Sequence, residues 1–151
     1  MNAVPTPARD HLAHVFAQYP LEVVSASGVW LHTADGRKVL DYYGGHAVAA
    51  LGYGHPRWIA ALEQQARSVP FQTNAIPMKV RERAAERLVR FANLGLDSVF
   101  FVNSGAEANE NALRLGFKQT GRSEAVALEH GWHGRTAACG AVTWGAREKW
   151  Y

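Results

Sequence analysis

The sequence predicts an α/β protein built around a buried parallel sheet, and three observations support this fold class. The run Ser98–Val102 is almost continuously apolar, which is typical of a strand covered on both faces. A helical segment follows from Gly105 to about Lys118, and a second apolar run spans Glu124–Leu128. Strand, helix and strand within about thirty residues form a βαβ unit.

The residues before this unit have a different pattern. Apolar residues at helical spacing predict a short helix over residues 8–18. Two β-rich runs, residues 29–33 and 38–42, lie on either side of Asp35-Gly36 and predict a hairpin.

Four glycines between Tyr43 and His55 predict an irregular loop, which is either a tight structural crossing or a place where a ligand approaches the backbone. Pro56 begins a helix, a position where its missing N–H costs nothing. A second amphipathic helix is predicted over residues 78–92 and ends at Asn93.

Composition limits the classes of function. Of 151 residues, 48% are hydrophobic and 19% charged, which predicts a folded globular chain. The net charge is only +3, and bases alternate with acids as in Arg81-Glu82-Arg83, so we expect a solvated helix face and no nucleic-acid partner. The single Cys139 excludes an internal disulfide, and no signal sequence or membrane-length apolar run is found, so a cytoplasmic protein without a membrane partner is predicted.

Two further kinds of site fit the sequence poorly. The pairs His11-x-x-His14 and His130-x-x-His133 have no nearby cysteine or clear third ligand, so no metal site is predicted. The turn at Asn103–Ala108 does not supply the Gly-x-Gly-x-x-Gly pattern of a nicotinamide-binding domain.

The segment Val102–Glu110 carries the most informative motif, because it ends a predicted strand and opens a helix. A helix N-terminus suits a phosphate, since it offers unpaired N–H groups and the positive end of the helix dipole. Gly105 and Ala106 let a phosphate approach the backbone, and the Ser104 hydroxyl can donate one more hydrogen bond. Ser104-x-x-Glu107 is equally an ordinary capping box, so both interpretations stay open at this point.

The whole chain resembles the class III aminotransferases, which are pyridoxal-phosphate-dependent enzymes of fold type I. The resemblance extends from about Tyr19 to Thr136. It rests, in order along the chain, on Asp35-Gly36-Arg37, Leu40-Asp41, Gly52–Pro56, Asn103–Glu110 and His130–Thr136. It implies that residues 1–55 form the N-terminal segment of the small domain, and that residues 56–151 begin the large parallel-sheet domain that binds the cofactor.

The same resemblance implies roles for individual residues. The backbone of Gly105 and Ala106 is expected to bind the cofactor phosphate, with Ser104 alongside. Trp132 occupies the position of an aromatic residue that stacks on the pyridine ring, where relatives more often have phenylalanine or tyrosine. Arg135 matches the arginine that grips the substrate α-carboxylate in the acetylornithine and ornithine enzymes.

Two further residues are expected near the substrate. Tyr19 lies near the N-terminal active-site aromatic of the family, and His46 falls in a loop position that faces the substrate. A purely structural role is the alternative for each of them.

The Schiff-base lysine of this family is expected beyond Tyr151, together with the acid that contacts the pyridinium nitrogen. The chain has four lysines, namely Lys38, Lys79, Lys118 and Lys149, and none of them suits the role. No catalytic residue is therefore predicted in this chain, which we expect to be an N-terminal fragment that is inactive alone.

The implied reaction moves the terminal amino group of N-acetylornithine or ornithine to or from 2-oxoglutarate, in arginine biosynthesis, by a homodimer in its full-length form. Three alternatives remain at this point: transfer from 4-aminobutyrate or another ω-amino acid, a related aminomutase or decarboxylase reaction, and a truncated chain with no activity of its own.

Overall fold

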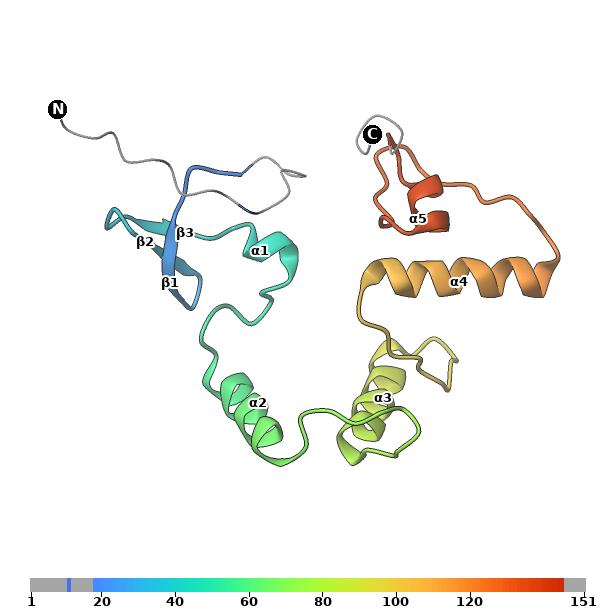
Figure 1. The fold of residues 1–151 in the computed structure, drawn as a ribbon, viewed down its shortest axis with the longest axis horizontal. Coiled ribbons are helices and arrows are strands. Elements are labelled where there is room, and N and C mark those ends of the chain that lie inside the picture. Colours follow the sequence, from blue (N-terminus) through green and yellow to red (C-terminus); the bar gives the residue numbers. More distant parts are fainter. Residues whose placement is uncertain (1–10, 12–17, 146–151) are drawn as a thin grey trace. The chain divides into compact units, whose positions relative to one another are not determined.

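The structure is a computed structural model that describes residue 11 and residues 18–145. The helix predicted over residues 8–18 lies almost wholly outside the described residues. The chain forms two compact units, Met1–Thr73 and Asn74–Tyr151 (Figure 1). The domain boundary after residue 55 that the family resemblance implies stays a prediction.

The first unit contains an antiparallel sheet with strand order β1-β2-β3. Its strands are β1 (Val23–Ser27), β2 (Trp30–Thr33) and β3 (Lys38–Leu40). The predicted hairpin is confirmed as β2 and β3, and the turn between them is held by a hydrogen bond of 3.0 Å from the Arg37 N–H to the Thr33 hydroxyl. Strand β1 was not predicted, because its sequence, Val-Val-Ser-Ala-Ser, does not alternate clearly between apolar and polar residues.

The glycine-rich loop after this sheet contains α1 (Gly44–Ala47), a single turn with left-handed backbone angles that include φ 66° at His46 and φ 60° at Ala47. A pair of backbone hydrogen bonds between Gly28 and Tyr53, 2.9 and 2.7 Å long, ties the end of the loop to the sheet. Helix α2 (Pro56–Ser68) follows and begins with proline as predicted.

The second unit contains three helices: α3 (Lys79–Ala92), α4 (Gly105–Thr120) and α5 (Ala137–Val142). Helices α3 and α4 match the sequence predictions. They end at Asn93 and Gly121, both in the left-handed conformation that commonly stops a helix. Helix α5 was not predicted, because six residues show no helical periodicity.

The two strands predicted at residues 98–102 and 124–128 are absent as strands, and the βαβ unit does not form within the described chain. Both segments run without a pairing neighbour, and Val126 and Leu128 are 99% and 81% exposed. A parallel strand needs hydrogen-bonding neighbours in its own sheet, and neither segment finds one here. The prediction that these two segments form buried strands is therefore wrong for the residues that the structure describes.

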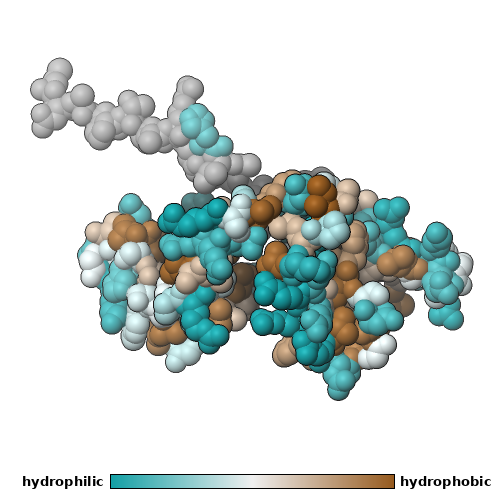
Figure 2. Space-filling view, turned by 90° about the horizontal axis from the view of Figure 1, so that it is seen from below, coloured by the Kyte–Doolittle hydropathy of each residue, from teal (hydrophilic) through white to brown (hydrophobic). Residues whose placement is uncertain are grey.

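Apolar surface is also open on the helices. Helices α2 and α3 have no buried residue, and Figure 2 shows hydrophobic residues at the surface among hydrophilic ones. The buried residues of the second unit, Gly134, Cys139 and Thr143, lie where α5 and the loop before it pack on α4. Among the helices described, none combines the length and apolarity needed to cross a bilayer.

Candidate cofactor and substrate site

The side chains of Ser104 and Glu107 cap the start of helix α4. Ser104 has extended backbone angles, and its hydroxyl oxygen accepts the Glu107 N–H at 3.1 Å. The Glu107 carboxylate in turn accepts the Asn103 N–H at 2.8 Å. Hydrogen bonds from the Ser104 hydroxyl and then from the Asn103 backbone hold the pKa of Glu107 below its ordinary value. The predicted capping box is therefore confirmed.

The capping box leaves the first two N–H groups of α4 available. Neither Gly105 nor Ala106 has an acceptor for its N–H in the part of the chain that the structure describes. A Cβ atom placed on Gly105 would meet nothing within 4 Å, so the space beside this residue is open. Two free N–H groups, a positive helix end and open space fit the phosphate of the implied cofactor. The Ser104 hydroxyl is already directed to the Glu107 carboxylate at 3.1 Å.

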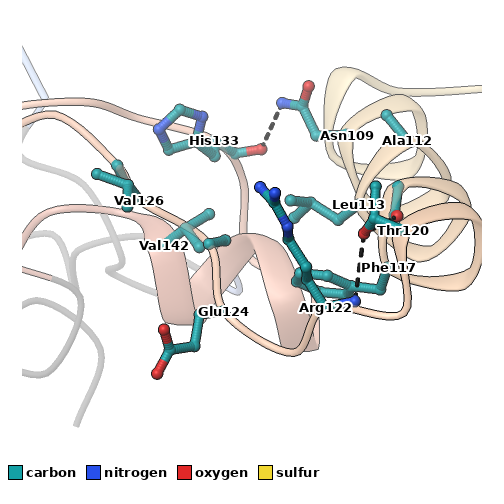
Figure 3. A pocket seen from close by; sticks show the side chains of 13 residues that line it. Asn109, Ala112, Leu113, Phe117, Thr120, Arg122, Glu124, Val126, His133 and Val142 are labelled. Atoms are coloured by element: carbon teal, nitrogen blue, oxygen red, sulfur yellow. Dashed lines mark hydrogen bonds between the residues drawn. The ribbon is translucent and has the colours of Figure 1, made fainter.

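Residues 130–136, the 130–136 loop, lie directly against this helix start. Gly134 is buried, and a Cβ atom built on it would be 2.6 Å from the Ala106 Cβ, so no side chain fits between them. The Asn109 side-chain amide donates a hydrogen bond of 2.9 Å to the His133 carbonyl (Figure 3). The structure thus brings together the two segments that carry Ser104, Gly105 and Ala106 on one side and Trp132 and Arg135 on the other.

Glu110 holds the far end of the 130–136 loop. Its carboxylate accepts the Thr136 hydroxyl at 2.6 Å and the N–H groups of Ala138 and Cys139 at 3.0 and 3.1 Å. The Thr136 hydrogen bond, followed by that from the Cys139 N–H, lowers the pKa of this carboxyl. Sequence reasoning assigned Glu110 no role, because its partners are 26 to 29 residues away along the chain.

The remaining predicted residues fall in both units. Trp132 is 52% exposed, and Arg135 is also exposed, on the 130–136 loop. Tyr19 and His46 belong to the Met1–Thr73 unit, where Tyr19 is 85% exposed and His46 hydrogen-bonds through Nδ1 with the Tyr43 hydroxyl. The roles of these four side chains toward a ligand stay predictions.

An apolar hollow of about 460 Å³ lies along α4, and Asn109 and His133 are among its lining residues (Figure 3). Leu113 and Phe117 of α4, Val126 of the extended segment and Val142 of α5 contribute its apolar walls. None of the predicted site residues lines it. Its walls include the unpaired segment around Val126, so the hollow marks a surface that lacks cover rather than the predicted cofactor site.

Comparison with known proteins identifies the family. Residues 12–149 match the family described as aminotransferase class-III. The chain belongs to this family. Its relatives include acetylornithine aminotransferase of Halalkalibacterium halodurans, 38% identical over 134 residues, and acetylornithine aminotransferase of Streptomyces coelicolor, 42% identical over 124 residues. These alignments cover 89% and 82% of this chain but only 34% and 30% of the relatives, so the chain spans about a third of their length.

Solved aminotransferase structures share the fold. Taurine:2-oxoglutarate aminotransferase from Bifidobacterium kashiwanohense, determined in complex with PLP and glutamate, superimposes with a TM-score of 0.80 at 26% identity. The match covers 85% of this chain and 30% of that one. The fold-type I assignment is therefore confirmed, and the family resemblance seen in the sequence is confirmed with it.

Proposed function

We propose that this chain is the N-terminal part of a pyridoxal-phosphate-dependent aminotransferase that moves the terminal amino group of N-acetylornithine, or of ornithine, to or from 2-oxoglutarate. The main observation in support of this proposal is the close contact of Gly134 with Ala106. It packs the 130–136 loop against the start of α4, where the N–H groups of Gly105 and Ala106 are available. The names of the relatives support N-acetylornithine as amino donor. We further propose a place in arginine biosynthesis and a cytoplasmic homodimer for the full-length enzyme.

Two groups in the chain would hold the cofactor. The N–H groups of Gly105 and Ala106 bind its phosphate, where hydrogen bonding and the helix dipole act in the same direction. The exposed Trp132 ring stacks on the pyridine. Pyridoxal phosphate supplies the electron sink for amino-group transfer when bound.

Arg135 would recognise the substrate. A guanidinium holds a carboxylate through two parallel hydrogen bonds and stays charged at any relevant pH, so it fixes both position and orientation. Tyr19 and His46 are also proposed to contribute to substrate fit.

None of the four lysines is proposed to hold the cofactor. Lys38 lies over the Trp30 ring, 4.4 Å from its centroid, and Lys79 forms an ion pair of 2.9 Å with Glu82. Lys118 is in the last turn of α4. At a helical rise of 1.5 Å per residue, it lies about 21 Å along the helix from Ser104. Lys149 lies outside the described residues. The 151-residue chain alone is therefore expected to have no transferase activity.

Kinetics of the full-length protein test the proposal. With N-acetylornithine and 2-oxoglutarate, Arg135→Lys should raise KM about tenfold or more with a smaller change in kcat, because a point charge replaces a bidentate fork. Arg114→Lys, an exposed arginine on α4, is the matched control and should leave both constants unchanged. Equal losses in the two variants would contradict the role of Arg135.

A panel of donors and the isolated chain complete the test. Preference for 4-aminobutyrate over N-acetylornithine and ornithine would overturn the proposed substrate and retain the reaction class. Borohydride treatment of the 151-residue chain mixed with pyridoxal phosphate should label no single lysine. Labelling of one lysine, or transfer of an amino group by the chain alone, would contradict the assignment of the cofactor lysine to a later segment.

A further inference from the structure

We propose that Glu110 and Asn109 are positioning residues that fix Arg135 relative to the phosphate-binding start of α4. This inference rests on the proposed function. Neither side chain is proposed to contact the substrate. Both form hydrogen bonds with the 130–136 loop.

The two side chains fasten the loop on both sides of Arg135. Asn109 donates to the carbonyl of His133, two residues before Arg135, at 2.9 Å. Glu110 accepts the hydroxyl of Thr136, the residue immediately after Arg135, at 2.6 Å. Because Asn109 and Glu110 are adjacent on one helix, the backbone around Arg135 is anchored to a single rigid element at two points.

Glu110 also replaces a local cap at the start of α5. Thr136 is the N-cap residue of this helix, but its side chain makes no cap hydrogen bond. The N–H groups of Ala138 and Cys139 donate to the Glu110 carboxylate instead, at 3.0 and 3.1 Å. A carboxylate near exposed N–H groups at a helix start is a favourable arrangement. The path of the backbone after Arg135 therefore depends on the Glu110 side chain of α4.

The same helix carries the proposed phosphate site one turn earlier. Gly105 and Ala106 precede Asn109 and Glu110 by three to five positions, and Gly134 packs on Ala106 at a distance that leaves no room for a methyl group. The first turns of α4 thus bind the phosphate of the cofactor and also anchor the loop that carries Arg135, the residue proposed to bind the substrate carboxylate. Misplacement of a binding group by about 1 Å can reduce catalysis about a hundredfold, so this coupling has a measurable consequence.

Glu110→Gln in the full-length protein is the central variant. The Thr136 hydroxyl and the N–H groups of Ala138 and Cys139 all donate to one carboxylate oxygen, Oε2, and the Ala138 N–H also lies 3.2 Å from Oε1. Glutamine removes the negative charge to which these groups donate, and with its oxygen at the Oε2 position its amide nitrogen, which cannot accept, would face the Ala138 N–H. We expect KM for N-acetylornithine to rise about tenfold with kcat within about threefold of the original value. For 1,4-diaminobutane, an amino donor without a carboxylate, kcat/KM should change less than about twofold, because this donor makes no use of Arg135.

A double-mutant cycle separates positioning from general support of the fold. In the Arg135→Lys background, Glu110→Gln should add less than about a twofold change, since the group it positions is already impaired. Glu63→Gln, an exposed glutamate on α2, is the matched control and should change nothing. Equal loss for both donors, or fully multiplicative effects in the cycle, would overturn the inference.

A measurement without substrate gives the second readout. Amide hydrogen exchange at Ala138 and Cys139 should accelerate in Glu110→Gln and stay unchanged in Glu63→Gln. If Glu110→Gln does not fold, Asn109→Ala, which removes one hydrogen bond, decides by the same donor comparison. If the unmutated full-length protein is inactive with N-acetylornithine but active with another donor that has a carboxylate, the proposed substrate is wrong. The comparison between that donor and 1,4-diaminobutane can still be made. Unchanged kinetics in both variants contradicts the positioning role alone.

Discussion

Asp41 in the first unit and Glu110 in the second make closely similar sets of hydrogen bonds. The Asp41 carboxylate accepts the N–H groups of Tyr43 and Gly44 at 2.9 and 2.8 Å and the Tyr53 hydroxyl at 2.6 Å. Glu110 likewise accepts two backbone N–H groups and one hydroxyl. Each carboxylate organises an irregular segment that carries a predicted substrate residue, His46 in one case and Arg135 in the other.

The two carboxylates differ in how far along the chain they reach. The backbone partners of Asp41 lie two and three residues away, whereas those of Glu110 lie 28 and 29 residues away. Asp41 supports a turn that is locally strained, since His46 and Ala47 have left-handed angles that cost about 1–2 kcal/mol per residue. Glu110 supports a loop by attaching it to a regular helix. A local anchor stabilises a conformation, and a long-range anchor sets the placement of one segment on another.

The largest effect is expected from Gly134→Ala. The new methyl group would lie 2.6 Å from the Ala106 Cβ on a residue with φ +130°, so the 130–136 loop must move away from α4. Overpacking of this kind costs about 1–3 kcal/mol. In the full-length protein we expect loss of most kcat/KM with N-acetylornithine, measured by initial rates.

Gly140→Ala is the control for this substitution. A methyl group on Gly140 meets nothing within 4 Å, and the residue lies in α5, where alanine is preferred to glycine. Activity should be retained. Similar losses in the two alanine variants would show that the close contact with Ala106 is not what places the loop.

Gly52→Ala tests the first unit and should have a smaller effect on activity. Its methyl group would lie 2.5 Å from the Gly28 carbonyl oxygen, so the paired hydrogen bonds between Gly28 and Tyr53 should break. We expect faster amide exchange at Gly28 and Tyr53, with little change at Ala138.

Gly54→Ala separates strain from collision at this loop. Gly54 has a φ of +73°, which is similar to that of Gly52, but a methyl group on Gly54 meets nothing within 4 Å. It should therefore accelerate exchange less than Gly52→Ala. Equal acceleration would mean that backbone strain, and not the contact with Gly28, controls this loop.

The smallest effects concern pH. Hydrogen bonds hold the pKa of Asp41 and the pKa of Glu110 below their ordinary values, with the Tyr53 hydroxyl as the largest cause for the first and the Thr136 hydroxyl for the second. Both anchors should therefore be intact above the ordinary carboxyl range and lost as the pH falls through each lowered pKa. Carbon-13 NMR of the two carboxyl groups, followed during acidification, measures both values. A midpoint at or above the ordinary value would contradict the corresponding anchor.

The two anchors should differ at alkaline pH. The Asp41 carboxylate raises the pKa of Tyr53, so the stabilisation of the protonated phenol is present at neutral pH and lost only as the pH rises through that raised value. Thr136 does not titrate in this range, so the Glu110 anchor has no alkaline limit. Exchange-sensitive NMR signals near Gly44 should change at high pH. A parallel change near Ala138 would indicate general unfolding.

Most of the secondary structure that depends on residues close together in the chain could be predicted from the sequence. Helices α2, α3 and α4 and the β2–β3 hairpin were predicted, because proline, asparagine, glycine and the capping box act within one turn of the residues they control. The family was also identified correctly from ordered motifs. Strand β1 was missed because its sequence does not alternate clearly between apolar and polar residues, and the helices α1 and α5 were missed because segments of four and six residues show no helical periodicity.

The sequence by itself determined the family, the main helices and the capping of α4 by Ser104 and Glu107, while the phosphate role of this helix start stays a proposal. Tertiary structure alone decided that residues 98–102 and 124–128 stay unpaired in this chain, because a strand exists only through its neighbours. It also decided that Gly134 seats on Ala106 and that Glu110 reaches Thr136 across 26 residues. Local propensities act over a few residues, whereas these contacts depend on how a distant loop returns to the helix, which no short pattern encodes.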